Sequence, residues 1–185
     1  MKKIISVICL ALLAACSGPL ERLPFAPQAS ALQLRPLVGS AIVRTVSLPA
    51  YAAAEEVATE LPSGLIASNE DILWADLPER AVTLILTETL TDILGVDVGP
   101  DPWPFVGLPD VAIDVRVARM LAGADGVFRL SGQFYVGGDG INYPNTTTAF
   151  DITAPMRDQS LGSVSAAQSV ALTELAETIA RRIGR

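Results

Sequence analysis

Four consecutive residues near the N-terminus, Leu13-Ala14-Ala15-Cys16, carry the clearest chemistry in the sequence. They close a short leader in which Lys2 and Lys3 precede a predominantly apolar stretch, residues 4–13. A leader that ends in small residues and a cysteine is typical of the processing site of bacterial lipoproteins. We predict a signal peptide over residues 1–15 and covalent lipid on the thiol and the freed amine of Cys16. The alternative is an ordinary secretory leader with an incidental cysteine.

The predicted lipid would hold the protein at a membrane that the leader is too short to span. A spanning helix needs about 20 apolar residues. Each buried methylene contributes about 0.8 kcal/mol, so two or more acyl chains give durable attachment. Lipoproteins retained at the inner membrane often carry aspartate after the cysteine, and this chain has Ser17. We therefore expect the inner leaflet of the outer membrane of a Gram-negative bacterium, with the domain facing the periplasm.

Most catalytic side-chain chemistry is missing from the sequence. It contains no histidine, its two cysteines are Cys9 and Cys16, and its only lysines are Lys2 and Lys3. These absences exclude Ser-His-Asp and Cys-His catalysis, histidine-ligated zinc and Schiff-base formation after residue 16. Beyond the leader, 11 arginines face 20 acidic residues, a net charge of −9 that argues against nucleic acid. We predict no enzymatic activity and no cofactor other than the lipid.

Carboxylates remain the one group with catalytic or metal-binding capacity. Asp97, Asp101, Asp110 and Asp114 cluster around a proline-rich segment, and paired carboxylates can hydrolyse glycosides or bind calcium. Solvated acids and helix or turn caps are the simpler interpretation. The run Gly137-Gly138-Asp139-Gly140 lacks both EF-hand spacing and the P-loop lysine, so it predicts a hairpin turn. No metal site is expected.

Three apolar side chains are candidates for contact with a partner or with lipid. Trp103 and Phe105 lie between prolines, which keep aromatic residues stiff and suit them to a binding surface. The alternative for Trp103 is a loop folded back onto the core. Leu84 falls on the polar face of a predicted helix, where it is either a partner contact or an ordinary exposed leucine.

The surrounding pattern predicts the elements that position these residues. Residues 16–31 are expected to form a proline-containing tether, and residues 50–73 are ambiguous. Apolar residues recur at helical spacing from Asp76, a good N-cap, to Gly95, a natural terminator. Period-two alternation and flanking turn residues predict strands at 32–37, 41–48, 111–118, 128–136 and 146–153. A second stripe of apolar residues at helical spacing predicts a C-terminal helix at 164–183.

These elements predict one α/β domain over residues 32–185. We expect two layers: a mixed, mostly antiparallel sheet of about five strands, covered by two main amphipathic helices. The strand at 41–48, the helix from Asp76 and the strand at 111–118 could form one right-handed crossover. The apolar content of 50% supports a packed core without a disulfide.

Four segments, in this order and spacing, resemble the ABC-type transport auxiliary lipoprotein family. The segments are Val46-Ser47-Leu48-Pro49-Ala50-Tyr51, Trp74-Ala75-Asp76-Leu77, Pro102-Trp103, and the final helix with Leu175 and Ile179-Ala180. With the lipidation motif, the resemblance covers most of residues 32–183. Two departures concern partners more than fold: an aromatic residue is missing near Leu32, and residues 52–63 lack basic side chains.

The resemblance implies a non-enzymatic subunit that works with MCE-domain proteins and an ABC or Pqi-type membrane component. Such systems are thought to move phospholipid between the inner and outer membranes. The expected role is to dock the tunnel-forming MCE-type subunit at the outer membrane, and the family makes a homo-oligomer plausible. Two alternatives stay open: an envelope-assembly or secretion accessory lipoprotein that binds an outer-membrane channel, and a carboxylate-dependent hydrolase using Asp97, Asp101 and Asp110.

Overall fold

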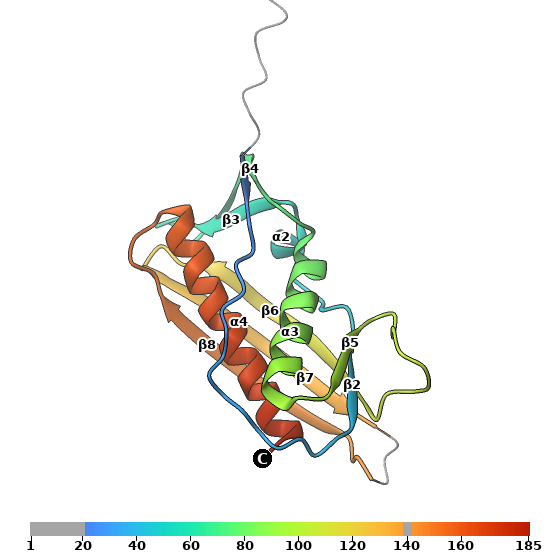
Figure 1. The fold of residues 1–185 in the computed structure, drawn as a ribbon. Coiled ribbons are helices and arrows are strands. Elements are labelled where there is room, and N and C mark those ends of the chain that lie inside the picture. The colour runs from blue at the N-terminus through green and yellow to red at the C-terminus, as the bar shows by residue number, and fades with distance from the viewer. Residues whose placement is uncertain (1–20, 139–141) are drawn as a thin grey trace, which may run out of the picture.

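The structure is a computed structural model that describes residues 21–138 and 142–185. The predicted signal peptide, Cys16, Ser17, and residues Asp139 and Gly140 of the predicted turn lie outside the described residues. Figure 1 shows the chain order of the elements, which are β1 (Glu21–Leu23), β2 (Ser40–Val43), α2 (Ala50–Ala53), β3 (Glu56–Glu60), β4 (Ile66–Trp74), α3 (Pro78–Leu94), β5 (Asp97–Pro100), β6 (Val111–Ala122), β7 (Val127–Gly137), β8 (Thr146–Pro155) and α4 (Leu161–Ile183).

The sheet is centred on β6. One edge of β6 pairs antiparallel with β7 along almost its whole length, and β7 pairs in turn with β8. The other edge of β6 pairs in parallel with β2 near Val111 and with β3 at Ala122. From these two points the sheet continues through β2 to β5 and through β3 and β4 to β1. β1 and β5 therefore lie at opposite ends of the strand order.

The α/β class and the mixed sheet are as predicted, but the expected number of about five strands was wrong. The described residues contain eight strands in one sheet. The longest ladders are antiparallel, whereas β1–β4, β2–β5, β2–β6 and β3–β6 are parallel. β1 and β5 have only three and four residues, too few for alternation to be recognised. β3 and β4 form a hairpin within the region that the sequence leaves ambiguous.

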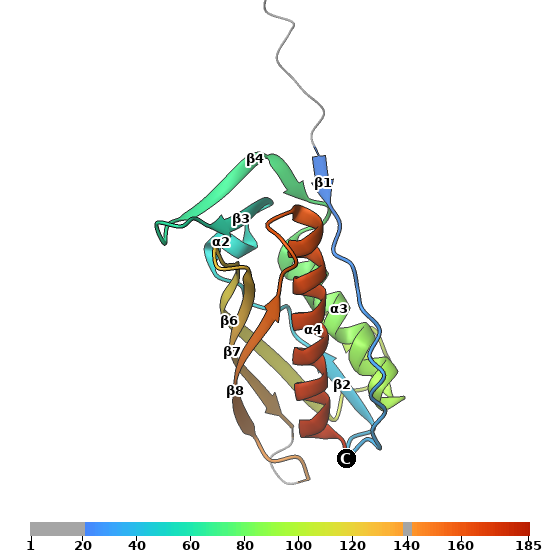
Figure 2. The same ribbon diagram turned by 90° about the vertical axis from the view of Figure 1, so that its left-hand side faces the viewer.

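Two long helices cover one face of the strands β6, β7 and β8 (Figures 1 and 2). α3 begins after Leu77 rather than directly after Asp76, whose carboxylate accepts from the Leu77 amide. It ends as predicted at Gly95, which has φ 63° and donates to the Thr91 carbonyl. α4 begins at Leu161, three residues before the expected start, because the Ser160 hydroxyl accepts from the Ser163 amide.

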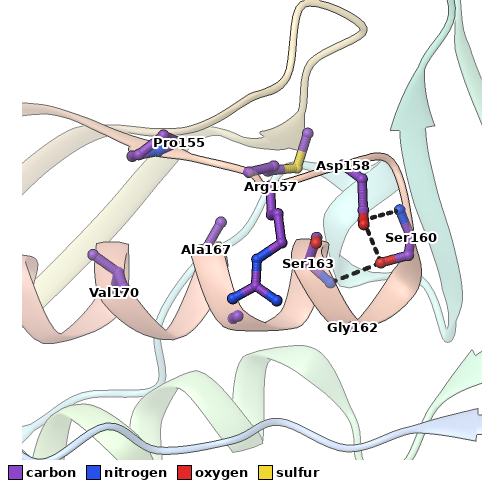
Figure 3. A pocket seen from close by; sticks show the side chains of 10 residues that line it. Pro155, Arg157, Asp158, Ser160, Gly162, Ser163, Ala167 and Val170 are labelled. Atoms are coloured by element: carbon purple, nitrogen blue, oxygen red, sulfur yellow. Dashed lines mark hydrogen bonds between the residues drawn. The ribbon is translucent and has the colours of Figure 1, made fainter.

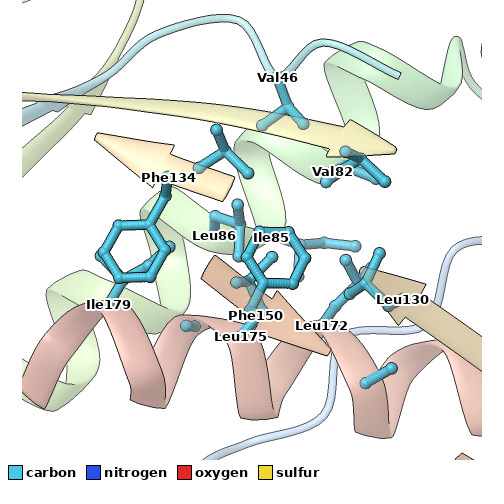
Figure 4. Packing of buried hydrophobic residues seen from close by; sticks show 14 of the residues in the cluster. Val46, Val82, Ile85, Leu86, Leu130, Phe134, Phe150, Leu172, Leu175 and Ile179 are labelled. Carbon is cyan, nitrogen blue, oxygen red and sulfur yellow. The ribbon is translucent and has the colours of Figure 1, made fainter. Parts of the chain in front are cut away.

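The core lies between these helices and the sheet (Figure 4). Alternate residues of the long strands point inward, and the apolar stripes of α3 and α4 face them. The largest fully buried side chains include Phe134, Leu86, Leu90, Leu172 and Ile179. Burial of one such side chain contributes about 1.5–3 kcal/mol. In the described part of the chain, none of the helices is both long and apolar enough to cross a bilayer.

The N-terminal segment differs from the expected tether. Residues 21–37 run along α4 for most of its length (Figure 2). Three hydroxyls at four-residue intervals on α4 donate to backbone carbonyls of every second residue in the segment: Ser165 to Pro24, Ser169 to Ala26, and Thr173 to Gln28. Four residues of helix advance about 6 Å, close to the advance of two extended residues. The spacing of the hydroxyls along α4 therefore matches the spacing of the carbonyls along the segment.

The far end of this segment is held by backbone bonds, and the predicted edge strand at 32–37 does not form. Leu34 N donates to Ile93 O at 3.0 Å, and Leu37 N donates to Ile183 O at 2.8 Å. Arg35 exchanges two backbone bonds with Arg185, of 2.8 and 2.9 Å. The segment satisfies its amides on the helix ends, so it does not need a strand partner.

Candidate partner-binding surface

The loop between β5 and β6, residues 101–110, exposes the densest group of apolar side chains. Val106 and Leu108 are 106% and 92% exposed, and Phe105 is 44% exposed. The rings of Trp103 and Phe105 meet edge to face with centroids 4.9 Å apart. A gathering of exposed apolar side chains is typical of a surface that binds another molecule, so this loop is the candidate site.

Local contacts hold the loop against the end of the sheet. Asp101 N donates to Val43 O at 2.9 Å, which ties the start of the loop to β2. Pro104 lies so close to Gly99 that a Cβ there would come within 2.6 Å of the proline ring. Gly107 has φ 89°, a conformation that other residues rarely adopt. These contacts fix the base of the loop, and the apolar side chains project beyond it.

Trp103 and Phe105 have different surroundings. Trp103 is half-buried against Gly99 and Phe105, and it is not among the described side chains that pack on the main core. Its indole nitrogen is buried without a hydrogen-bond partner. Phe105 points to the surface against the edge of that ring. The pair thus consists of an inner aromatic support and an outer apolar contact. Their role in binding stays a prediction.

A groove of about 680 Å³ lies beside the loop. Its wall combines apolar and charged side chains, including Ile42, Arg44, Asp101, Trp103, Leu108 and Tyr143. The polar wall is ordered, because the Asp110 carboxylate accepts from Gly39 N at 2.7 Å and from the Tyr143 hydroxyl at 3.4 Å. Leu84, the third candidate, lies on α3 at 37% exposure and is not among the residues that line this groove.

The four aspartates around the loop do not form a common site. The Asp110 carboxylate accepts a hydrogen bond from the Gly39 amide. Asp114 lies on β6, where its two carboxylate oxygens accept from the Arg116 guanidinium at 3.1 and 3.0 Å. Asp97 and Asp101 are exposed. Among residues 21–138 and 142–185, no group of three or more acidic or cysteine side chains is arranged to hold a metal ion.

A second hollow, of about 570 Å³, opens between the end of β8 and the start of α4 (Figure 3). Its polar groups belong to the helix cap. The Asp158 carboxylate accepts from the backbone and the hydroxyl of Ser160, and the Ser160 hydroxyl accepts from Ser163 N at 3.3 Å. The Ser160 and Ser163 hydroxyls lower the pKa of Asp158 to about 2. This hollow is explained by capping, so we assign it no ligand.

The sequence analysis missed a second exposed apolar group, at the tip of the β3–β4 hairpin. Leu61, Leu65 and Ile66 are 41%, 67% and 44% exposed. The signal was present in the sequence as Leu61-Pro62-Ser63-Gly64-Leu65, a proline and a glycine flanked by leucines. This tip and the 101–110 loop follow strands near opposite ends of the sheet order.

Comparison with solved structures identifies proteins with the same fold. The fold is shared with solved structures at low sequence identity. One, titled as an uncharacterized protein, has a TM-score of 0.72 at 18% identity and covers 89% of this chain and 100% of its own. Another, XCC0632 from Xanthomonas campestris, described as DUF330, has a TM-score of 0.69 at 12% identity and covers 86% and 94%. A search of curated proteins finds no match.

The family follows from the sequence itself. Residues 22–180 match the model of the ABC-type transport auxiliary lipoprotein component, and the chain belongs to this family. The protein is therefore an auxiliary component of a transport system. The match starts at Arg22, so it includes the N-terminal segment that lies on α4. The resemblance drawn from the four sequence segments is confirmed.

Proposed function

We propose that the protein is an outer-membrane-anchored periplasmic lipoprotein of an intermembrane phospholipid transport system, and that it docks the tunnel-forming MCE-type subunit at the outer membrane. Lipid on Cys16 would confine the domain to the membrane plane and so raise its effective concentration near the tunnel protein. Ser17 favours the outer membrane. The domain acts by position, without catalysis.

The observation that carries the proposal is the placement of the apolar loop relative to the anchored end. The chain from Cys16 enters the fold at β1, and the 101–110 loop follows β5 at the other end of the strand order. An apolar loop so placed is free to meet a periplasmic partner while β1 stays near the membrane. Phe105, Val106 and Leu108 offer exposed apolar area on a loop whose base is tied to β2.

The test is co-purification from detergent-solubilised envelopes with the Val106→Asp, Leu108→Asp double variant. Both side chains are almost fully exposed, so unfolding transitions should match those of the unaltered protein. We expect MCE-type and permease subunits to be recovered with the unaltered protein and lost with the variant. The matched control is Val170→Asp, an apolar residue of α4 that is 40% exposed. Undiminished recovery with the double variant would contradict the proposed surface.

The co-purification also tests the alternative role in secretion or envelope assembly. Recovery of a secretin or an assembly factor in place of MCE-type subunits would favour the secretion or assembly role. The replacements Asp97→Asn, Asp101→Asn and Asp110→Asn keep the size of the side chains, and an asparagine at 110 can still accept from the Gly39 amide. They should leave the transport phenotype intact, whereas a carboxylate-dependent hydrolase would lose its activity. Mass spectrometry of the mature polypeptide should find acyl chains on Cys16. The native mass of the purified protein will show whether copies self-associate.

A further inference from the structure

The anchored end of the domain carries its own apolar tip, the β3–β4 hairpin described above. β1 pairs in parallel with the last residues of β4, from Ile72 to Trp74, so the chain from Cys16 enters the fold directly beside this hairpin. Figures 1 and 2 both place β4 at the end of the molecule where β1 begins. The hairpin and the entry point of the chain thus share one end of the domain.

The length of chain outside the described residues sets how far this end can lie from the membrane. Cys16 precedes Glu21 by five positions, and a fully extended chain covers at most about 18 Å over that distance. The expected tether of 16 residues would allow much more, but residues 24–28 are bonded to α4. The hairpin tip is about 20 Å from β1 along β4, a comparable distance. When the domain leans so that β4 faces the membrane, the tip lies within reach of the bilayer.

The chemistry of the tip suits the surface of a bilayer. Residues 61–69 contain no charged side chain, so contact with the acyl region would not require burial of a charge. Glu60, just before this stretch, is paired with Arg119 at 3.3 Å. Glu70 and Asp71 follow it on exposed positions of β4, where they would stay in the headgroup or water layer.

The tip is also ordered before any contact. Leu61 N donates to Leu65 O and Gly64 N donates to Leu61 O, both at 2.8 Å. Gly64 has φ 82°, which closes the turn. Leu61, Leu65 and Ile66 therefore project from a fixed turn, and their insertion would cost little conformational entropy. We propose that these three side chains insert into the phospholipid bilayer that holds the lipid of Cys16.

This inference rests on the proposed anchor, and the test separates the two. The described domain contains no cysteine, and the predicted mature chain has only Cys16, which the lipid blocks. Leu65→Cys in the lipidated full-length protein therefore gives one thiol for an environment-sensitive fluorophore. The labelled protein is reconstituted on vesicles of phosphatidylethanolamine and phosphatidylglycerol that contain a spin-labelled quencher lipid. Leu61→Cys is a second probe position, and Leu108→Cys on the opposite loop is the control.

We expect the emission at positions 61 and 65 to shift to the blue and to be quenched by the lipid, with neither effect at position 108. Protein that floats with the vesicles but is quenched equally at 65 and 108, or at neither, overturns the hairpin contact and leaves the anchor standing. Protein that does not float, with a reactive thiol at Cys16, overturns the anchor and the contact together.

Discussion

The ring of Phe25 stacks on the ring of Trp74, with centroids 4.4 Å apart and planes inclined by 29°. This contact joins the N-terminal segment to the last residue of β4. Arg22 reinforces it, because its guanidinium donates to Trp74 O at 3.0 Å. The position of β1 beside β4 is therefore set by side-chain contacts and not only by three residues of strand pairing.

Phe25→Ala should loosen that entry point. Loss of the half-buried ring and of the stacking contact is expected to lower the free energy of unfolding by about 1–2 kcal/mol. Hydrogen exchange of the amides in residues 21–23 should accelerate more than exchange in the long strands. Phe105→Ala, which removes an exposed ring on the 101–110 loop, is the control. It should change neither the free energy of unfolding nor amide exchange in β1. Unchanged exchange in β1 for Phe25→Ala would contradict this account.

The hydroxyls of α4 should hold the N-terminal segment in place. A triple variant, Ser165→Ala, Ser169→Ala and Thr173→Val, removes the three hydroxyls that face the segment. The single protons of Ser169 and Thr173 are shared with carbonyls of α4 itself, those of Ser165 and Ser169. At about 1 kcal/mol for a full hydrogen bond, we expect a loss of about 1–3 kcal/mol in chemical unfolding and faster proteolysis before residue 30. The control is Thr178→Val, whose hydroxyl donates to Glu174 O within the same helix. A triple variant no less stable than this control would disprove the role.

Asp158 should contribute to stability against acid. Its pKa is lowered to about 2 from 3.8, first by the Ser160 hydroxyl and then by that of Ser163. Between these values the unfolded chain binds a proton that the folded protein does not, so stability falls as pH drops from about 4 to about 2. Asp158→Asn should therefore lose less stability across this interval than the unaltered protein.

The measurement is the midpoint of urea unfolding at several pH values from 5 to 2. Thr178→Val, a change in the same helix that removes no titratable group, is the control and should keep the original slope. Asp125, whose pKa is also lowered to about 2 by Arg129, leaves a residual slope in every variant. A slope identical in Asp158→Asn and in the unaltered protein would refute the assignment.

Replacing Gly132 and Gly162 by alanine should change the free energy of unfolding in opposite directions. A Cβ on Gly132 would lie 2.2 Å from Arg116 O and 2.9 Å from Val117 Cα, so β6 would have to move. We expect Gly132→Ala to destabilise the protein by about 1–3 kcal/mol. A Cβ on Gly162, in the first turn of α4, meets no atom within 4 Å. Gly162→Ala should stabilise the protein by up to about 1 kcal/mol. Thermal unfolding of both variants tests the pair.

The elements that could be predicted are those whose pattern is set by one buried face. The alternation around Ile113, Leu130 and Ile152 and the helical stripes of α3 and α4 all report burial against the same core. Gly95 ends α3 as its sequence indicates, because glycine adopts the left-handed conformation without cost. Local sequence therefore sufficed where periodicity and capping decide structure.

The N-terminal segment could not be predicted, because its partners are about 140 residues away. Pro24 and Pro27 indicate a tether, since proline cannot donate a backbone hydrogen bond. Residues 24–28 act as acceptors instead, and the carbonyl of Pro24 serves as well as any other. Within the candidate surface, Trp103 and Pro104 both lie against Gly99, where a Cβ would come within 2.6–3.0 Å of them, and a single sequence does not reveal this approach.

The carbonyls of Pro24, Ala26 and Gln28 accept hydrogen bonds from α4, and Arg35 pairs with Arg185, which has a consequence for folding. These pairings join parts of the chain that are more than 140 residues apart in sequence. Closing so long a loop costs conformational entropy that only the completed core can offset, so we expect the N-terminal segment to settle on α4 late in folding. A chain in which α4 has not yet formed therefore has no surface on which this segment can pack.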